Sequence, residues 1–553
     1  MKRPLVIVGC IVLAVVCLGS SAEGGAAASS QPGGAARLLR PIAEFDPYSI
    51  TRLICEGLPD SALSILEGER HSGVKDPMVH LLRARTLRDK LSDEDEDKSL
   101  IKRDCEAILA ELDRAIAICD EALDKSDSDP LYRYYRGRAY LGKAQINTLT
   151  RSYWGAGRSA SKGKGDLEKY LKIVPDNPDA QGDLGAFLYF ADTLPGVIKL
   201  VSKLLFIPGG DREEGLRLLY HASTQPGVFQ IDYQIAVAAI DLLFEGRLEQ
   251  GVDAMLALAD RYPYYTRLIE PFGVLAPLYP RRLREFQRIE DKTVERRLAR
   301  GDESIDWNLI KRLHLHRAYA NMFFGSPKTA VLELTTLIEN PPARPDWMLP
   351  LAIINRGHLY AKRDDTEAAR EAFSFVAMRD DMKHYHNLAN GLIESLDPPW
   401  KTVDLNDLEF IGSIYDRRLD VAAAGLDRYE QSYGKDALYY FYLGELKSFA
   451  NDFVAAAQAY AACLDEEATG GDESYQMFAS LRLAEIHGHE LRYDRAEVYI
   501  KEATEYTHAG YLFDFMIHSR RRYYKLLKDG TLTTPPTMLL YQSARRSGSP
   551  SAQ

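Results

Sequence analysis

Cysteine is scarce in this chain of 553 residues, which contains six. Cys10 and Cys17 lie in the N-terminal apolar segment, and four remain for the rest of the chain: Cys55, Cys105, Cys119 and Cys463. No Cys-x-x-Cys pair or cysteine–histidine spacing typical of zinc occurs, which argues against a disulfide scaffold or a zinc site. All four fall among helical signals and are expected to be small buried side chains. A bridge between Cys105 and Cys119 stays open, because sequence separation does not fix distance.

Basic residues are not in excess. The chain has 69 lysines and arginines against 80 aspartates and glutamates, a formal net charge of −11. Affinity for nucleic acid depends on neutralising phosphates, so we expect no nucleic-acid partner. With 46% hydrophobic and 27% charged residues, the chain is also too apolar to be disordered as a whole. Its length suits three or four domains, or one long repeat array.

The N-terminal apolar run, residues 5–18, is too short for a comfortable membrane span of about 20 residues. It follows Met1-Lys2-Arg3 and precedes the small residues Gly19 to Ala22, which is the pattern of a secretory signal peptide. We therefore predict a signal peptide over 1–22, a flexible leader over 23–40, and export to the periplasm or cell envelope, with secretion as an alternative destination. An uncleaved anchor is the alternative.

Period-two alternation is lacking, whereas one set of spacings recurs along the chain. A small residue is followed at fixed distances by another small residue and by larger apolar ones. The sets are Ala484, Tyr493, Ala496, Ile500 and Ala503; Gly444, Phe453, Ala456, Tyr460 and Cys463; Gly357, Tyr360, Ala369, Phe373 and Val376; and Gly325, Ala330, Leu334, Leu337 and Pro342. Val174 to Pro178 leads into Leu184-Gly185, and Asp129-Pro130 leads into Gly137 and Tyr140, in the same frame.

This pattern resembles the tetratricopeptide repeat (TPR), a helix-turn-helix unit of 34 residues. The resemblance implies an all-α, TPR-like helical-repeat solenoid of antiparallel helix pairs, although the signature tryptophan is absent. The small residue of the first helix lets the second helix approach closely. We expect degenerate repeats over 41–397, an interruption at Asp397 to Trp400, C-terminal repeats over 401–529, and a disordered tail over 530–553.

One block, residues 194–216, departs from the repeat pattern. It carries an apolar run with Lys199 and Lys203, then a Pro-Gly-Gly turn, and Asp211 with Glu214 three residues later predicts a capping box. We expect 197–207 to form a helix packed against the repeats; the alternative is a peripheral membrane contact through this stretch. The block also resembles the Iml2 / tetratricopeptide-domain-39 family, which implies a helical-repeat protein with a membrane-proximal or lipid-related role.

The sequence contains no recognisable catalytic motif. Gly155 to Asp166 is rich in glycine and lysine, but Lys164 is followed by Gly165 and the spacing of a phosphate loop is not met. The histidines of the pairs 314/316, 384/386 and 487/489 would point about 200° apart on a helix, so the members of a pair cannot share a metal. We predict a protein that is not an enzyme and has no cofactor or metal site.

Without a catalytic motif, the repeat pattern points to a binding surface. In the TPR frame the first helix of each pair lines a concave groove, and seven side chains are predicted to face it: Tyr134, Arg138, His358, Phe441, Glu445, Phe478 and Glu485. Aromatic residues with a few charges suit recognition of a protein or peptide partner, and burial between repeats is the competing interpretation. The predicted function is a non-enzymatic binding scaffold of the bacterial cell envelope. The alternatives are a solute-binding accessory subunit of a transport system and a membrane-associated, lipid-related helical-repeat protein.

Overall fold

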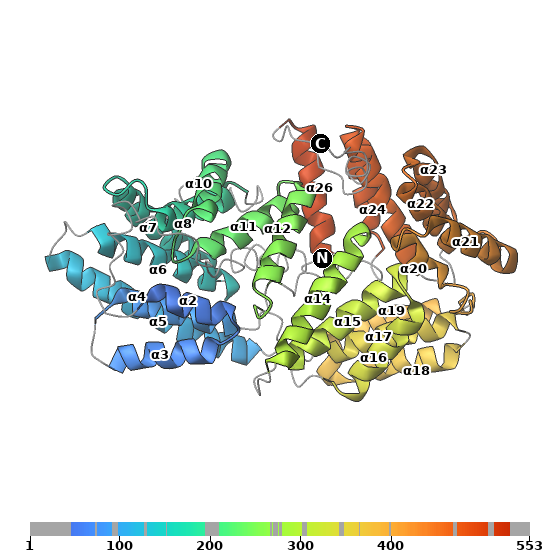
Figure 1. Ribbon diagram of the computed structural model, residues 1–553, viewed down its shortest axis with the longest axis horizontal. Helices are drawn as coiled ribbons and strands as arrows, with labels where there is room; N and C mark the ends of the chain where they lie inside the picture. The colour runs from blue at the N-terminus through green and yellow to red at the C-terminus, as the bar shows by residue number, and fades with distance from the viewer. Residues whose placement is uncertain are drawn as a thin grey trace, which may run out of the picture. The chain divides into compact units, whose positions relative to one another are not determined.

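The computed structural model describes residues 46–530, except 72–74, 91–97, 126–129, 151, 194–208, 266–267, 269–274, 276–278, 301–306, 342–347, 364, 398–399, 468–472 and 507–513. The predicted signal peptide, leader, apolar run of the 194–216 block and tail beyond residue 530 lie outside this part of the chain. Over the described residues every regular element is a helix and there is no strand, which confirms the all-α prediction (Figure 1).

The chain divides into two compact units, Met1–Ile240 and Asp241–Gln553. Unit 1 contains α2 (Pro47–Cys55), α3 (Pro59–His71), α4 (Pro77–Lys90), α5 (Lys98–Lys125), α6 (Pro130–Leu149), α7 (Tyr153–Leu171), α8 (Pro178–Thr193) and α10 (Arg212–Thr224). The unit boundary falls within α11 (Gln230–Leu243). The repeat ranges 41–397 and 401–529 stay predictions.

Unit 2 continues with α12 (Leu248–Arg261), η3 (Pro280–Arg282), α14 (Leu283–Ala299), α15 (Trp307–Phe324), α16 (Pro327–Glu339), α17 (Met348–Lys362), α18 (Thr366–Ala377), η4 (Asp380–Tyr385) and α19 (His386–Ser395). It ends with α20 (Phe410–Tyr415), α21 (Leu419–Tyr433), α22 (Ala437–Phe449), α23 (Phe453–Asp465), α24 (Ser474–His489), α25 (Tyr493–Ala503) and α26 (Asp514–Lys528). In the part of the chain with described coordinates, no helix is long and apolar enough to cross a membrane.

Successive helices pack against each other as pairs, and three turns within pairs share one geometry. The turns from α20 to α21, α22 to α23 and α24 to α25 each place one residue at positive φ: Arg417 at 59°, Asn451 at 64° and Leu491 at 60°. In each turn the next amide donates to the carbonyl five residues earlier, at 2.8, 2.9 and 2.8 Å. This bond closes a Schellman motif, which satisfies a carbonyl at the end of the first helix. The recurrence confirms the helix-pair repeat.

The small residues of the predicted frame lie where paired helices cross. A Cβ placed on Gly444 would lie 2.4 Å from Tyr460 Cε1, and one on Gly357 would lie 2.7 Å from Phe373 Cε1. In both pairs the ring follows the glycine by 16 residues. Such distances leave no room for a methyl group, so glycine permits the close approach that the sequence predicted.

Gly325 is an exception, and its predicted place in the first helix is wrong. Helix α15 ends at Phe324, so Gly325 lies in the turn before α16. Ala318 stands 12 residues before Ala330, as Gly444 stands before Ala456, and it is fully buried. Ala318 therefore takes the small position of this pair.

Local capping follows the sequence at α10. Asp211 precedes the helix and accepts a hydrogen bond from the Glu214 amide at 3.0 Å, as predicted. The Glu214 carboxylate instead accepts hydrogen bonds from Arg217 at 2.6 and 2.7 Å. Only the first half of the capping box is formed, because the arginine one turn later competes for the glutamate.

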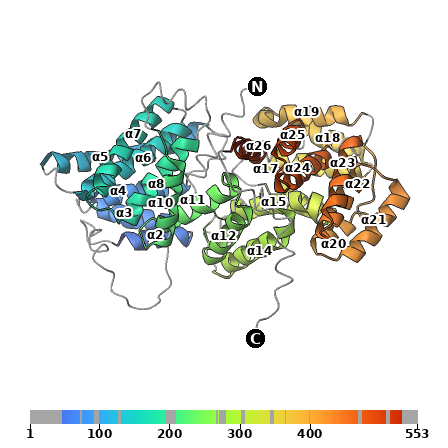
Figure 2. The ribbon, with the colours of Figure 1, turned by 90° about the horizontal axis from the view of Figure 1, so that it is seen from above.

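The first helices of the pairs in unit 2 also pack on one another. Contacts join α15 to α17 and α20, α20 to α22, and α22 to α24. Helix α24 is buried along most of its length and lies among α15, α22, α23, α25 and α26 (Figure 2). Side chains of α15 and α24, which are far apart in the sequence, thus pack together inside unit 2.

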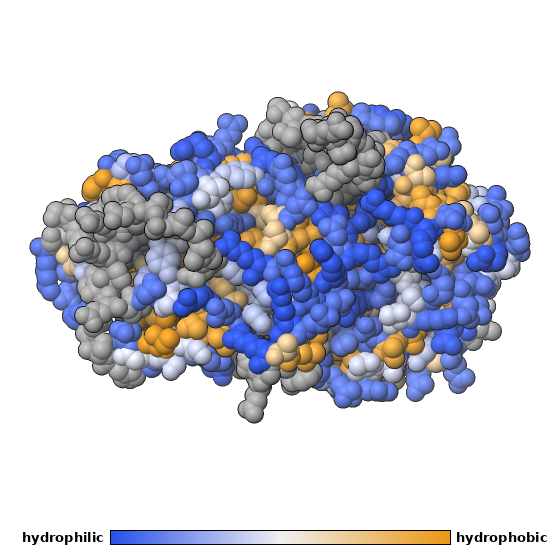
Figure 3. Space-filling model, viewed as in Figure 1, coloured by the Kyte–Doolittle hydropathy of each residue, from blue (hydrophilic) through white to orange (hydrophobic). Residues whose placement is uncertain are grey.

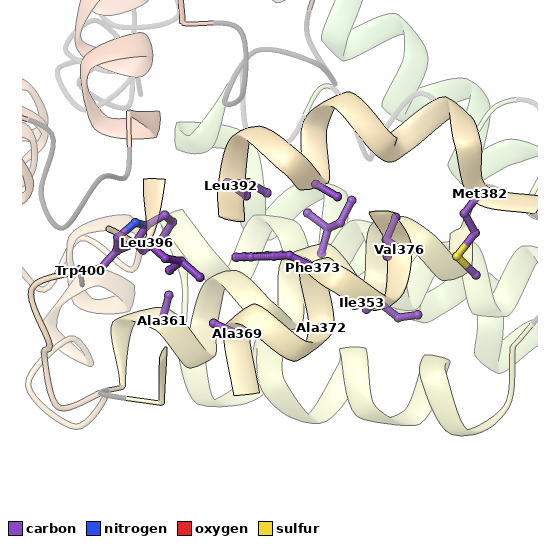
Figure 4. Close-up of a cluster of buried hydrophobic side chains, with 12 residues drawn as sticks. Ile353, Ala361, Ala369, Ala372, Phe373, Val376, Met382, Leu392, Leu396 and Trp400 are labelled. Carbon is purple, nitrogen blue, oxygen red and sulfur yellow. The ribbon is translucent and has the colours of Figure 1, made fainter. Parts of the chain in front are cut away.

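A hydrophobic cluster joins α17, α18, η4 and α19 (Figure 4). Trp400 closes it from the segment after α19: its side chain is 2% exposed and its Nε1 donates to the Ser395 carbonyl at 2.9 Å. The predicted interruption of the array around 397–400 therefore includes a side chain that belongs to the core of this unit.

Candidate functional site

Two of the predicted groove residues, Tyr134 and Arg138, lie one turn apart on α6 of unit 1. Tyr134 has no exposed surface, and its ring centroid lies 5.3 Å from that of Tyr135 and 5.4 Å from that of Tyr170 on α7. Its ring is therefore part of the packing between α6 and α7.

Arg138 lies at the centre of an ionic network. It pairs with Asp183 on α8, and its Nη2 lies 3.4 Å from Asp232 Oδ2 on α11. Its Cζ lies 3.2 Å from the centroid of the Phe229 ring, and its Nη1 donates to the Tyr233 hydroxyl at 3.3 Å. Burial opposes the charge, but the surrounding anionic and phenolic oxygens raise the pKa of Arg138 well above its ordinary value. The guanidinium thus stays charged inside the unit.

The network extends to the first helices of unit 1. Arg85 on α4 donates to Asp232 at 3.2 Å and to the Thr51 hydroxyl of α2 at 2.8 Å. Burial raises the pKa of Asp232, while Arg85 and Arg138 lower it. Four helices, α4, α6, α8 and α11, are thereby joined through buried charges, and α2 joins them through the Thr51 hydroxyl.

Asp179 on α8 holds the start of α11 in place. Its carboxylate accepts hydrogen bonds from the backbone amides of Val228 and Phe229 at 2.9 and 3.0 Å. Burial raises the pKa of Asp179 to about 6, against the opposing effect of Arg138 and these amides. The hydrogen bond from its amide to Asp179 positions Phe229, and the Arg138 guanidinium packs on the Phe229 ring.

In unit 2, Phe441 on α22 and Phe478 on α24 belong to a buried aromatic group. Their ring centroids are 6.1 Å apart. Phe478 also contacts Phe323 and Phe324 of α15, with centroids 5.5 and 5.1 Å away. Tyr475 lies 5.8 Å from Phe441 in the same group. Aromatic side chains from three helices thus fill the space that the sequence assigned to the groove.

Glu445 lies beside this group, with 1% of its surface exposed. Its carboxylate accepts hydrogen bonds from the hydroxyls of Tyr415 and Tyr460, both at 2.7 Å, and from Arg482 Nε at 2.9 Å. Three donors compensate the loss of hydration that a buried carboxylate suffers.

Glu485 continues the network towards α26. It pairs with Arg520, and Arg482 Nη1 lies 4.0 Å from its second carboxylate oxygen. Arg520 Nη2 donates to the Tyr279 hydroxyl at 2.6 Å. Burial raises the pKa of Tyr279, so the hydroxyl stays protonated and neutral beside the arginine.

His358 on α17 contacts Trp400, which belongs to the hydrophobic cluster that joins α17, α18, η4 and α19. Its ring centroid lies 4.6 Å from that of Trp400 and 6.4 Å from that of Phe323, both nearly perpendicular. It therefore links that cluster to the aromatic group around Phe478.

Sequence reasoning missed the arginines that complete these networks. Arg281 in η3 packs with its Cζ 4.5 Å from the centroid of the Phe449 ring and donates to Ser448, while Arg482 and Arg520 pair with the predicted glutamates. Burial lowers the pKa of Arg281 to about 10. No local pattern marks these residues, although an arginine flanked by leucines, as Arg482 is in α24, is a usable signal of a buried charge.

Neighbouring helices thus cover most of the seven predicted groove residues. Tyr134, Phe441, Phe478 and Glu445 are at most 1% exposed. They belong to two separate networks, one in each unit. Direct contact with a partner stays a prediction for all seven.

Other chemistry-bearing side chains lie apart from these networks. The glycine- and lysine-rich stretch from Gly155 to Asp166 is part of helix α7 and not of a loop. The four cysteines among the described residues, Cys55, Cys105, Cys119 and Cys463, are buried, and burial raises the pKa of the Cys119 and Cys463 thiols. Among the described residues, no group of three or more acidic, histidine or cysteine side chains could hold a metal ion.

Comparison with known proteins adds little to this geometry. No family model matches the chain. No curated protein sequence matches it either. The crystal structure of the P58(IPK) TPR domain aligns over 78% of this chain and 98% of that one, at 14% identity and a TM-score of 0.18. The class of protein, an all-α array of TPR-like helix pairs, is therefore defined by the turns and helix crossings of this chain itself. The resemblance of residues 194–216 to the Iml2 family is not confirmed.

Proposed function

We propose that this chain is a non-enzymatic protein-binding scaffold of the bacterial cell envelope. The observation that carries the proposal is the repeated helix pair, with its common turn and its glycine-to-ring crossing at Gly357–Phe373 and Gly444–Tyr460. Arrays of such pairs present long, rigid surfaces, which is the property that scaffolds use. The signal-peptide pattern supports the envelope setting.

The interior networks support this role by fixing the helices. Neighbouring helices bury Glu445, Arg482 and the aromatic group. A partner can therefore contact only the exposed faces of the helices, and not these residues. Three second helices of unit 2 each expose an apolar residue two positions from the buried alanine of the same helix (Ala330, Ala456 or Ala496): Leu332 at 67%, Val454 at 71% and Val498 at 57%. On the face in Figure 3, hydrophobic residues form small groups separated by polar ones.

Site-specific photo-crosslinking tests the proposal. A photoreactive phenylalanine analogue is placed singly at Leu332, Val454 and Val498 in the full chain, expressed with its signal, and the cells are irradiated. We expect discrete adducts in the envelope fraction from at least one position. The matched control is the same analogue at the exposed polar positions Arg370 and Lys501, outside these apolar positions.

Two outcomes would overturn the scaffold function. One is that none of the three positions gives an adduct in either the membrane or the soluble part of the envelope fraction. The other is ligand-induced thermal stabilisation by a small solute, which favours the solute-binding accessory subunit instead. Recovery of the chain only in the cytoplasm would contradict the envelope setting but not the scaffold function.

A further inference from the structure

Helix α7 of unit 1 presents one continuous solvent-exposed face. With 100° between successive residues, Trp154, Arg158, Lys162, Lys169 and Lys172 fall within an arc of about 80° along about 27 Å of helix. All five are exposed. We call these five residues the α7 stripe.

The opposite side of α7 is the buried one. Gly157, Gly163, Leu167 and Tyr170 face the core of the unit, where α7 packs on α6 and α8. In Figure 2, α7 runs along one side of unit 1, with α6 and α8 on its inner side. The stripe is therefore an outer ridge and not the wall of a groove.

The charge of this ridge is opposite to that of the chain. From residue 152 to 173 there are five cations, and Glu168 is the one exposed carboxylate, 3.5 Å from Lys164. The other carboxylate, Asp166, is buried and accepts hydrogen bonds from Arg136 at 2.7 and 2.9 Å. Within the described residues the four cations of the stripe form no ion pair, in a protein with a net charge of −11.

The stripe begins with one exposed aromatic residue, Trp154, which is 63% exposed. Its neighbour Tyr153, 53% exposed, also lies at the start of α7 but about 100° away around the helix, beside the stripe. Gly165 lies in the middle of the stripe, and a Cβ there would have no atom within 4 Å. The middle of the ridge is therefore low. Lys162 beside it lies against α6, where its Nζ donates to the Tyr140 hydroxyl at 3.3 Å and stands 4.9 Å from the centroid of that ring.

We propose that the α7 stripe docks on the surface of an anionic lipid bilayer. A plane can contact all residues of a straight ridge at once, whereas a protein segment bound by charge would need flanking walls for shape complementarity. Each lysine or arginine near an anionic membrane surface adds to the affinity for it, and tryptophan and tyrosine favour the headgroup level. The contact lies outside residues 197–207 and does not rest on the scaffold function.

Vesicle binding by the full-length chain tests the proposal. The probes are vesicles of phosphatidylcholine alone and with about 30 mol % phosphatidylglycerol, at low and high salt. We expect co-sedimentation with the anionic vesicles only, and release by salt. The quadruple variant Arg158→Gln, Lys162→Gln, Lys169→Gln and Lys172→Gln should weaken binding at least about tenfold, since four charge contacts are lost.

A charge-matched control separates the stripe from net charge. The variant Arg363→Gln, Arg370→Gln, Arg428→Gln and Lys501→Gln removes four exposed cations that are dispersed over unit 2. It should bind as the unchanged chain does. Trp154→Phe should retain binding but lose the blue shift of tryptophan fluorescence that vesicles induce, because the three other tryptophans lie outside α7.

Three results would overturn the proposal. The stripe variant could bind as well as the control, or the chain could bind neutral and anionic vesicles equally. Alternatively, polyglutamate could bind the chain while vesicles do not, which would assign the stripe to an acidic protein segment. Circular dichroism and the melting temperature of each variant verify that folding is unchanged.

Discussion

Arg482 Nε donates to Glu445 Oε1 at 2.9 Å, and each of these side chains is 2% exposed. The pair joins α22 to α24 at the centre of unit 2, where the hydroxyls of Tyr415 and Tyr460 complete the coordination of the carboxylate. An ion pair at this depth is sensitive to the loss of one partner, because the other charge is then left in a medium that cannot hydrate it.

Removing either partner should therefore destabilise unit 2. We expect Glu445→Ala and Arg482→Ala each to lower the free energy of unfolding by about 3–5 kcal/mol, measured by urea denaturation. The double variant Glu445→Leu with Arg482→Met should lose less than the sum of the two single changes. Single losses below about 1 kcal/mol would show that the pair is not structurally important.

Glu290 on α14 predicts a dependence of stability on pH. The side chain is 3% exposed, burial raises its pKa to about 7, and Arg317 at 3.4 Å only partly offsets this. A carboxyl with a raised pKa binds more protons in the folded than in the unfolded state, so its contribution to stability falls as the pH rises from about 4.5 to about 7.

Glu290→Gln should remove that dependence. At pH 8 the free energy of unfolding of the variant should exceed that of the unchanged chain by up to about 3 kcal/mol, given a pKa shift of this size. At pH 4.5 the two should differ little. Melting temperatures across this pH range provide the measurement, and a variant that is less stable at pH 8 would show that the Arg317 contact outweighs the burial of the charge.

Gly215 predicts a steric limit between α8 and α10. A Cβ at this position would lie 2.5 Å from the backbone nitrogen of Tyr189. Because a backbone atom cannot rotate away, Gly215→Ala should cost about 1–3 kcal/mol of unfolding free energy. Gly165→Ala, in a helix with open space around it, is the control and should stabilise unit 1 by about 0.5–1 kcal/mol. Equal effects would contradict the close crossing.

Leu491 has a strained backbone conformation in the turn between α24 and α25. Its φ is 60°, and 61% of the side chain is exposed, so little packing offsets the unfavourable conformation. Leu491→Gly should raise the stability of unit 2 by up to about 1 kcal/mol. The same change at exposed Leu332, in the middle of α16, should lower it by about 1 kcal/mol. Thermal unfolding of the two variants decides, and a loss of stability in both would contradict the strain.

The sequence by itself determined the all-α class and the internal geometry of the helix pairs. The spacing of 16 residues between Gly444 and Tyr460 spans two helices and one turn, so helical periodicity and turn length place these residues together. The cap at Asp211 is equally local. Such features depend on a few neighbouring residues, and their pattern is visible without knowledge of the rest of the chain.

Only the tertiary structure decided what the inner side chains contact. Phe323 and Phe478 are 155 residues apart, and their contact depends on the angles accumulated over all the intervening pairs. The same accumulation placed Arg482 opposite Glu445 and covered residues that the TPR frame assigned to a groove. A small change of angle per pair separates an open array from a closed one, and side-chain packing, not spacing along the sequence, sets that angle.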